Sequence, residues 1–209
     1  KSVEDPSNPK GSEVADKALR YDLTVPFARY VVQNAGQLAL PFKRYQMQPV
    51  WRADNPQKGR FREFYQCDAD VVGSKSLWQE VELIHLYQQA FQALKLPVTI
   101  RLNNRKVLAG IAEVSGVGDC LVDFTVALDK LDKIGKAGVL AELESKGFSS
   151  AELYSLEPAM QSFNDVAGSL EFLRNWLAPS AIGMQGVSEL EFVLEHAGEA
   201  PLAIDITLA

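Results

Sequence analysis

Two segments rich in aromatic and β-branched residues, 41–53 (PFKRYQMQPVWRA) and 60–73 (RFREFYQCDADVVG), constrain the fold more than any other feature of the chain. They flank the sequence DNPQKG, in which asparagine, proline and glycine favour a turn. Aromatic and β-branched side chains favour extended backbone on both sides of that turn. The sequence therefore predicts an antiparallel hairpin.

One face of this hairpin is predicted to be polar, because side chains alternate between the two faces of a strand. This face carries Arg44, Gln46, Gln48, Arg52, Arg62, Phe64, Gln66, Asp68 and Asp70. It is either a solvent-facing side, which is common in antiparallel sheets, or the floor of a ligand site. The second interpretation is favoured by Phe64, which a solvated face has little reason to hold. Cys67 lies on the opposite face, which we expect to pack in the core.

Basic side chains are concentrated in the hairpin and its turn. Six of them fall between positions 43 and 62, namely Lys43, Arg44, Arg52, Lys58, Arg60 and Arg62, with Asp54 as the acidic residue of the turn. The planar guanidinium group is suited to binding phosphate oxygens in pairs. This composition favours an anionic ligand at the hairpin.

Helices are predicted before and after the hairpin. Apolar spacing predicts a helix over 25–35 with Thr24 as its cap, and a long amphipathic helix over 76–95 that begins with a capping box of Ser76 and Gln79. Residues 97–102 (PVTIRL) read as a short strand, and Asn104 is expected to cap a helix over 105–114. Residues 1–17 are expected to form a flexible lead-in.

The segment after Gly116 is predicted to be a small, acidic, mostly helical module. Its helical stretches are 126–133, 139–146, 151–156, 170–177 and 187–196, with short Gly, Ser or Pro breaks between them. Residues 202–208 return to β character. We therefore expect an α+β fold in which a helical domain, 116–201, is inserted into a sheet domain formed by 18–115 and 202–209.

Charge and cysteine content exclude several classes of protein. The net charge of −6 over 209 residues argues against a nonspecific nucleic-acid binder, which needs a cationic surface. Cys67 and Cys120 form no CxxC pair, so no metal site is predicted and a reducing, cytoplasmic setting is expected. No run of 18 apolar residues occurs, so we expect no membrane partner. His85 and His196 have no nearby nucleophile or ligand in the sequence and are interpreted as structural or exposed.

The hairpin sequence, RYQMQPVWRADNPQKGRFREFYQCDADVVG, resembles motif 2 of class II aminoacyl-tRNA synthetases. Together with LRYDLTVPFARY it is similar to the histidyl-tRNA synthetase family in particular, nearest to its eukaryote-like branch. The agreement continues through LNNRKVLAGIAEVSG, TVALDKLDKIG and LAIDITLA. The resemblance implies part of an antiparallel-sheet catalytic domain with an inserted helical domain. It also implies an enzyme that activates histidine with ATP and transfers it to the 3′ end of its tRNA.

The resemblance also assigns roles to residues. Arg52 is the implied catalytic arginine, which contacts the α-phosphate and the amino-acid carboxylate. The residues implied to bind ATP are Arg52, Asp54, Arg60 and Phe64, and those implied to bind histidine are Asp22, Thr24, Arg52, Gln66 and Asp70. Asp54 departs from the glutamate that the class usually has. Gln57 and Lys58, at the tip of the turn, are expected to meet the tRNA acceptor end.

The resemblance further implies Mg²⁺ accompanying ATP and a homodimeric full-length enzyme. In the family, the strand that matches LAIDITLA is followed by an Arg-Gly-Leu-x-Tyr-Tyr element with a catalytic arginine. We therefore expect the chain to be a fragment without motif 1, motif 3 and the anticodon-binding domain, and to be inactive alone.

Two other functions fit part of the sequence. One is a catalytically inactive synthetase-like module, such as the regulatory subunit of ATP phosphoribosyltransferase or a tRNA-sensing domain. The presence of Arg52 and Arg60 favours the enzyme, because a module without ATP chemistry does not need phosphate-binding arginines. The other, a helical adaptor, leaves the polar face of the hairpin unexplained and ranks last.

Overall fold

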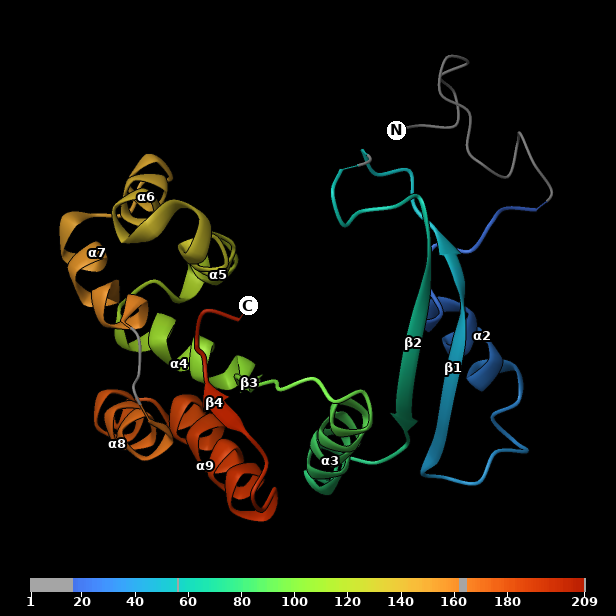
Figure 1. Cartoon of the computed structure of the whole chain (residues 1–209). Helices are drawn as coiled ribbons and strands as arrows, with labels where there is room; N and C mark the ends of the chain where they lie inside the picture. Colours follow the sequence, from blue (N-terminus) through green and yellow to red (C-terminus); the bar gives the residue numbers. More distant parts are fainter. Residues whose placement is uncertain (1–16, 56, 162–164, 209) are drawn as a thin grey trace. The chain divides into compact units, whose positions relative to one another are not determined.

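A computed structural model of the chain describes residues 17–55, 57–161 and 165–208 (Figure 1). The predicted lead-in therefore lies outside the described residues except for Lys17. The chain divides into two compact units, residues 1–75 and 76–209. Each unit is described separately.

The first unit contains helix α2 (Thr24–Gln33) and the strands β1 (Phe42–Trp51) and β2 (Glu63–Val72). The two strands pair antiparallel, with Arg44 opposite Asp70 and Gln48 opposite Gln66. The predicted hairpin is confirmed. Its register places the predicted polar side chains of both strands on one face.

The polar face of the hairpin is the face that the rest of the unit covers. The Phe27 ring of α2 stacks on Phe42 with 6.2 Å between ring centres, and Leu23, just before α2, is fully buried. The opposite face is exposed at Tyr45, Met47, Tyr65 and Cys67. The prediction that Cys67 packs in the core is therefore wrong, because α2 and the segment before it pack on the polar face.

The predicted caps of the first two helices also need correction. Helix α2 begins at Thr24 itself, and the Asp22 carboxylate accepts a hydrogen bond from the Val25 amide at 3.0 Å. Helix α3 (Trp78–Ala93) begins after Leu77, and the Ser76 hydroxyl accepts a 3.4 Å hydrogen bond from the Trp78 amide. Asp22 thus takes the place of Thr24 as the residue that bonds the first turn of α2, whereas Ser76 bonds the first turn of α3 without the predicted capping box.

The second unit is mostly helical and holds a short parallel strand pair (Figure 1). Its elements after α3 are β3 (Ile100–Leu102), α4 (Arg105–Val114), η1 (Gly118–Cys120), α5 (Leu121–Leu128), α6 (Leu131–Ser145), α7 (Ser150–Leu156), η2 (Glu157–Met160), α8 (Val166–Leu177), α9 (Ala181–His196) and β4 (Leu202–Ile204). Strand β3 pairs with β4. This pairing brings together two segments that are separated by about a hundred residues of helical chain.

Some sequence expectations hold in this unit and one needs correction. Asn104 caps α4 by accepting a hydrogen bond from the Lys106 amide at 2.8 Å. The two helices predicted over 126–133 and 139–146 are shifted, because α5 ends at Leu128 and α6 contains a kink at Gly135, whose φ of 68° suits glycine. His85 Nε2 donates to the Ala197 carbonyl at 3.2 Å, and the His196 ring stacks on Phe192, so both histidines make structural contacts.

The core of the second unit is built on the contact between α4 and α9. Apolar residues of α4, α5, α6, α8 and α9 form one buried cluster with Ile204 and Ile206. Gly110 of α4 and Gly183 of α9 allow the two helix backbones to touch. The fold class is α+β, as predicted. Among the described residues, no helix is long and apolar enough to cross a membrane.

Candidate functional site

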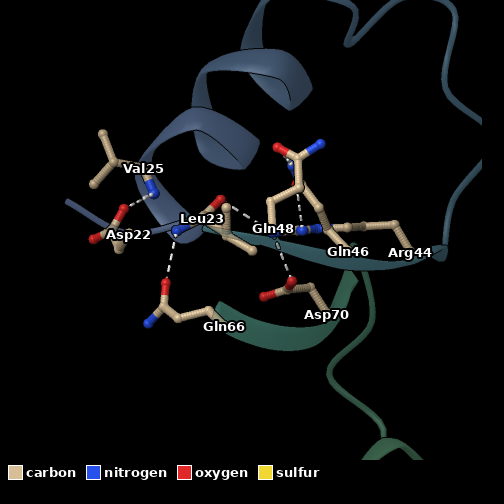
Figure 2. A network of polar contacts seen from close by, with 8 residues as sticks. All are labelled: Asp22, Leu23, Val25, Arg44, Gln46, Gln48, Gln66 and Asp70. Atoms are coloured by element: carbon tan, nitrogen blue, oxygen red, sulfur yellow. Dashed lines mark hydrogen bonds and ion pairs between the residues drawn. The ribbon is translucent and has the colours of Figure 1, made fainter. Parts of the chain in front are cut away.

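The peptide of Leu23 is held from both sides in the first unit (Figure 2). The Leu23 amide donates to Gln66 Oε1 at 3.1 Å, and Arg44 Nη2 donates to the Leu23 carbonyl at 3.1 Å. Asp22 and Thr24, the residues on either side of this peptide, are two of the predicted histidine-binding residues. The hairpin thus fixes the backbone that carries them.

Arg44 also pairs with Asp70, the residue opposite it in the hairpin. Their side chains approach to 2.8 Å and are 11% and 24% exposed. Figure 2 shows this pair next to the Leu23 backbone, whose amide is bonded to Gln66. Arg44 was placed on the polar face by the sequence but was not assigned a role in the site. The sequence position of Arg44 could have indicated this ion pair, because strand alternation and the hairpin register place Arg44 opposite Asp70.

A row of amide side chains continues from Arg44 along β1. Arg44 Nη1 donates to Gln46 Oε1 at 2.7 Å, and Gln46 Nε2 donates to Gln48 Oε1 at 3.1 Å. Arg20 also donates to Gln48 Oε1. Each donor in this row orients the next side chain, so the polar face is an ordered network and not a loose solvated surface.

A hollow of about 280 Å³ lies at the turn end of the hairpin. It is lined by Arg52, Asp54, Gly59, Arg60, Phe61 and Phe64. All four residues predicted to bind ATP therefore surround one space. Phe61 was missed by the sequence analysis, although it is 67% exposed and stands next to Arg60. An exposed ring beside a basic turn is the signal that could have indicated it.

Arg52 is held in place by aromatic side chains and by the backbone. Its guanidinium carbon lies 4.5 Å from the centre of the Tyr21 ring and 5.1 Å from that of Phe64. Its Nε donates to the Tyr21 carbonyl at 3.5 Å, and its amide donates to the Arg62 carbonyl at 2.9 Å. Aromatic faces attract a cation and leave the edge of the guanidinium available to an anion.

The turn after β1 is closed by backbone contacts. Gln57 and Arg60 bond to each other through their amides and carbonyls at 3.3 and 2.8 Å, and Gly59 adopts a φ of 81°. Arg62 Nε donates to the Asp54 carbonyl at 3.3 Å. Gln57 and Lys58, the predicted tRNA contacts, are exposed at the tip of this turn.

The two ends of the polar face differ in chemistry. One end presents carboxylates and amide oxygens, which suit an ammonium group. The other end presents arginines and aromatic rings, which suit phosphates and a flat heterocycle. In the part of the chain that the structure describes, no group of three or more His, Cys, Asp or Glu side chains could hold a metal ion. The arrangement can bind an amino acid beside a nucleotide.

Comparison with known proteins agrees with this arrangement. A family model described as histidyl-tRNA synthetase matches residues 14–209. The chain is 58% identical over 203 residues to the histidine–tRNA ligase of Flavobacterium johnsoniae. The matched region covers 94% of this chain and 43% of that protein. The crystal structure of histidyl-tRNA synthetase from Nostoc sp. PCC 7120 matches with a TM-score of 0.81 at 32% identity, over 91% of this chain and 46% of that chain.

A second solved structure, an ATP phosphoribosyltransferase regulatory subunit/histidyl-tRNA synthetase from Bacillus halodurans C, matches with a TM-score of 0.75 at 20% identity, over 91% of this chain and 50% of that chain. This likeness shows the fold alone. The chain spans about half the length of the curated relatives it matches. These relatives are bacterial and do not support the expected eukaryote-like branch.

Proposed function

The chain belongs to the histidyl-tRNA synthetase family, and we propose that it supplies part of the active site of a histidine–tRNA ligase. The relatives that it matches over 94–95% of its length carry that name. In the proposed reaction, an oxygen of the histidine carboxylate attacks the α-phosphorus of ATP and pyrophosphate leaves. A hydroxyl of the terminal tRNA ribose then attacks the carbonyl carbon of the adenylate, and AMP leaves.

Arg52 has the central role in this proposal. Negative charge develops on the phosphoryl oxygens during the first step and must be met by a cation that is already in position. Arg52 is such a cation, because the rings of Tyr21 and Phe64 and the Tyr21 carbonyl fix its guanidinium. Its remaining N–H groups are proposed to contact both the α-phosphate and the histidine carboxylate.

The remaining ATP residues are proposed to hold the nucleotide in the hollow at the turn. Phe64 would stack on adenine, Asp54 would contact the adenine amino side, and Arg60 would bind the γ-phosphate. ATP enters as its magnesium complex, so Mg²⁺ is part of the substrate in this proposal. The support is that these side chains line one space of about 280 Å³.

The histidine substrate is proposed to lie at the carboxylate end of the polar face. Its ammonium group needs acceptors, which Asp22, Gln66 and Asp70 provide. Thr24 is proposed to shape the same pocket through its hydroxyl. The support is the network in Figure 2, which ties the segment before α2 to both strands.

The wider organisation is proposed from the resemblance. Residues 18–115 and 202–209 would belong to the catalytic domain and 116–201 to an inserted helical domain, which the pairing of β3 with β4 supports. Gln57 and Lys58 would meet the tRNA acceptor end. The whole enzyme is proposed to be a cytoplasmic homodimer.

The observation that carries the proposal is that Arg52, Asp54, Arg60 and Phe64 surround one hollow on the polar face. The test uses the chain joined at both ends to the flanking segments of its 58% identical relative, called the extended protein below. This protein should exchange pyrophosphate into ATP with histidine and not with other amino acids. Histidine binding without exchange would instead identify an inactive regulatory module.

A further inference from the structure

We propose that Arg44 is a positioning residue of the histidine site: it holds Asp70 and the Leu23 peptide in the arrangement that receives the amino acid. The inference rests on the proposed function, because it concerns the same site. Arg44 would not touch histidine or ATP. It would act through the residues that do.

The contacts of Arg44 join three separate segments. Its Nη2 group donates to the Leu23 carbonyl at 3.1 Å and lies 2.8 Å from the Asp70 carboxylate. Its Nη1 group donates to Gln46 Oε1 at 2.7 Å. One planar group thus links Leu23 before α2, Gln46 of β1 and Asp70 of the opposite strand β2. A lysine has one point charge and cannot keep this set of contacts.

The fourth contact fixes the plane of the guanidinium. Its carbon lies 4.2 Å from the centre of the Phe27 ring in α2. The side chain is 11% exposed, so water does little to stabilise its charge, and the charge depends on Asp70 and the Leu23 carbonyl. The orientation of Asp70 is therefore coupled to the position of the segment that carries Asp22 and Thr24.

The ion pair with Arg44 does not occupy every hydrogen-bond acceptor position of the Asp70 carboxylate. Among the described residues, Asp70 Oδ2 and Arg44 Nε are buried polar atoms that make no hydrogen bond of good geometry. Arg44 contacts Asp70 as an ion pair, which sets the charge and location of the carboxylate without saturating its acceptors. The carboxylate keeps capacity for an ammonium group.

The test compares Arg44→Met and Arg44→Lys with Lys75→Met in the extended protein. Lys75 is an exposed basic residue of the first unit that lies after β2. The readouts are the KM values for histidine and ATP in pyrophosphate exchange, the Kd for histidine by calorimetry, and the melting temperature. Asp70→Asn and the double variant with Arg44→Met complete a mutant cycle.

We expect Arg44→Met to raise the KM and Kd for histidine by roughly tenfold or more, because a small misplacement of binding groups is costly. The KM for ATP should change by less than about twofold, and Lys75→Met should leave all values unchanged. Arg44→Lys should recover part of the loss. The loss caused by Arg44→Met should be smaller in the Asp70→Asn background than in the unsubstituted protein, because part of the effect of Arg44 passes through Asp70.

An unchanged Kd for histidine in folded Arg44→Met would overturn the inference, as would an equal loss for histidine and ATP. If Arg44→Met does not fold, an unchanged histidine Kd in Arg44→Lys overturns it. Failure of the proposed function gives a different result: the extended protein then shows no exchange, and Arg44 is judged on histidine binding alone. No histidine binding by the unsubstituted protein would overturn both.

Discussion

The guanidinium carbon of Arg52 lies 5.1 Å from the centre of the Phe64 ring, and both side chains border the same hollow. The ring is half-buried, and it supports the cation while offering an aromatic surface to the hollow. This relationship makes the hollow suitable for a nucleotide, whose base and phosphates need different surfaces.

Replacing Phe64 by alanine should therefore weaken ATP binding. Loss of a stacking ring is worth roughly 1–3 kcal/mol per base, so the KM for ATP of the extended protein should rise by roughly 5-fold to 150-fold. The KM for histidine should change less. Tyr154→Ala, which removes an exposed ring of α7, is the control and should leave both values unchanged. Equal KM values for ATP in Phe64→Ala and the unsubstituted protein would contradict a stacking role.

The hairpin and its residue pairs could be predicted from sequence, because both depend on local properties. Strand alternation and turn chemistry set the pairing that brings Arg44 opposite Asp70. The Asn104 cap was predictable for the same reason, since an asparagine side chain reaches the amide two residues later. The four ATP residues followed from the family resemblance, and their grouping around one hollow follows from the hairpin.

The covered face of the hairpin could not be predicted. Alternation says that two faces differ, but it does not say which face the rest of the chain covers. Here the segment before α2 lies on the polar face, buries Leu23 and leaves Tyr65 and Cys67 exposed. The role of Arg44 was missed for the same reason, because it depends on a backbone carbonyl 21 residues earlier in the chain.

The close approach of α4 and α9 predicts that adding one methyl group at Gly110 lowers the stability of the chain. A Cβ atom at Gly110 would lie 2.4 Å from the Gly183 Cα atom, which is backbone and cannot rotate away. Alanine favours helix over glycine by about 1 kcal/mol, yet Gly110→Ala should destabilise the chain by about 1–3 kcal/mol through overpacking. Denaturant unfolding measures this. Gly118→Ala, where no atom lies within 4 Å, is the control, and a stabilised Gly110→Ala variant would refute the contact.

An ion pair between Lys106 of α4 and Glu189 of α9 predicts that the stability of the fold depends on pH. The hydrogen bond from Lys106 is the largest cause that lowers the pKa of the Glu189 carboxyl below its ordinary value of 4.5; partial burial opposes it, and Asn104 assists it. Because the pKa is lowered by folding, the carboxylate stabilises the fold at neutral pH. This contribution should be lost as the pH falls below about 4.5 and through the lowered pKa.

Glu189→Gln should therefore melt at a lower temperature than the unsubstituted chain at pH 7. The difference between the two should shrink progressively as the pH is lowered, because protonated Glu189 no longer pairs with Lys106. Glu195→Gln changes an exposed glutamate of the same helix and should leave the pH dependence unaltered. A difference that stays constant down to pH 3 would show that the ion pair does not stabilise the contact.

The most direct measurement is histidine-dependent ATP–pyrophosphate exchange by the extended protein, compared with its Arg52→Ala variant. We predict exchange with the unsubstituted protein and a reduction of roughly 100-fold or more in Arg52→Ala, as for the loss of a group that stabilises transition-state charge. Arg105→Ala, which changes an exposed arginine of α4, should exchange normally. Absence of exchange in the unsubstituted extended protein, with histidine still bound, would contradict the account and identify a binding module instead of a ligase.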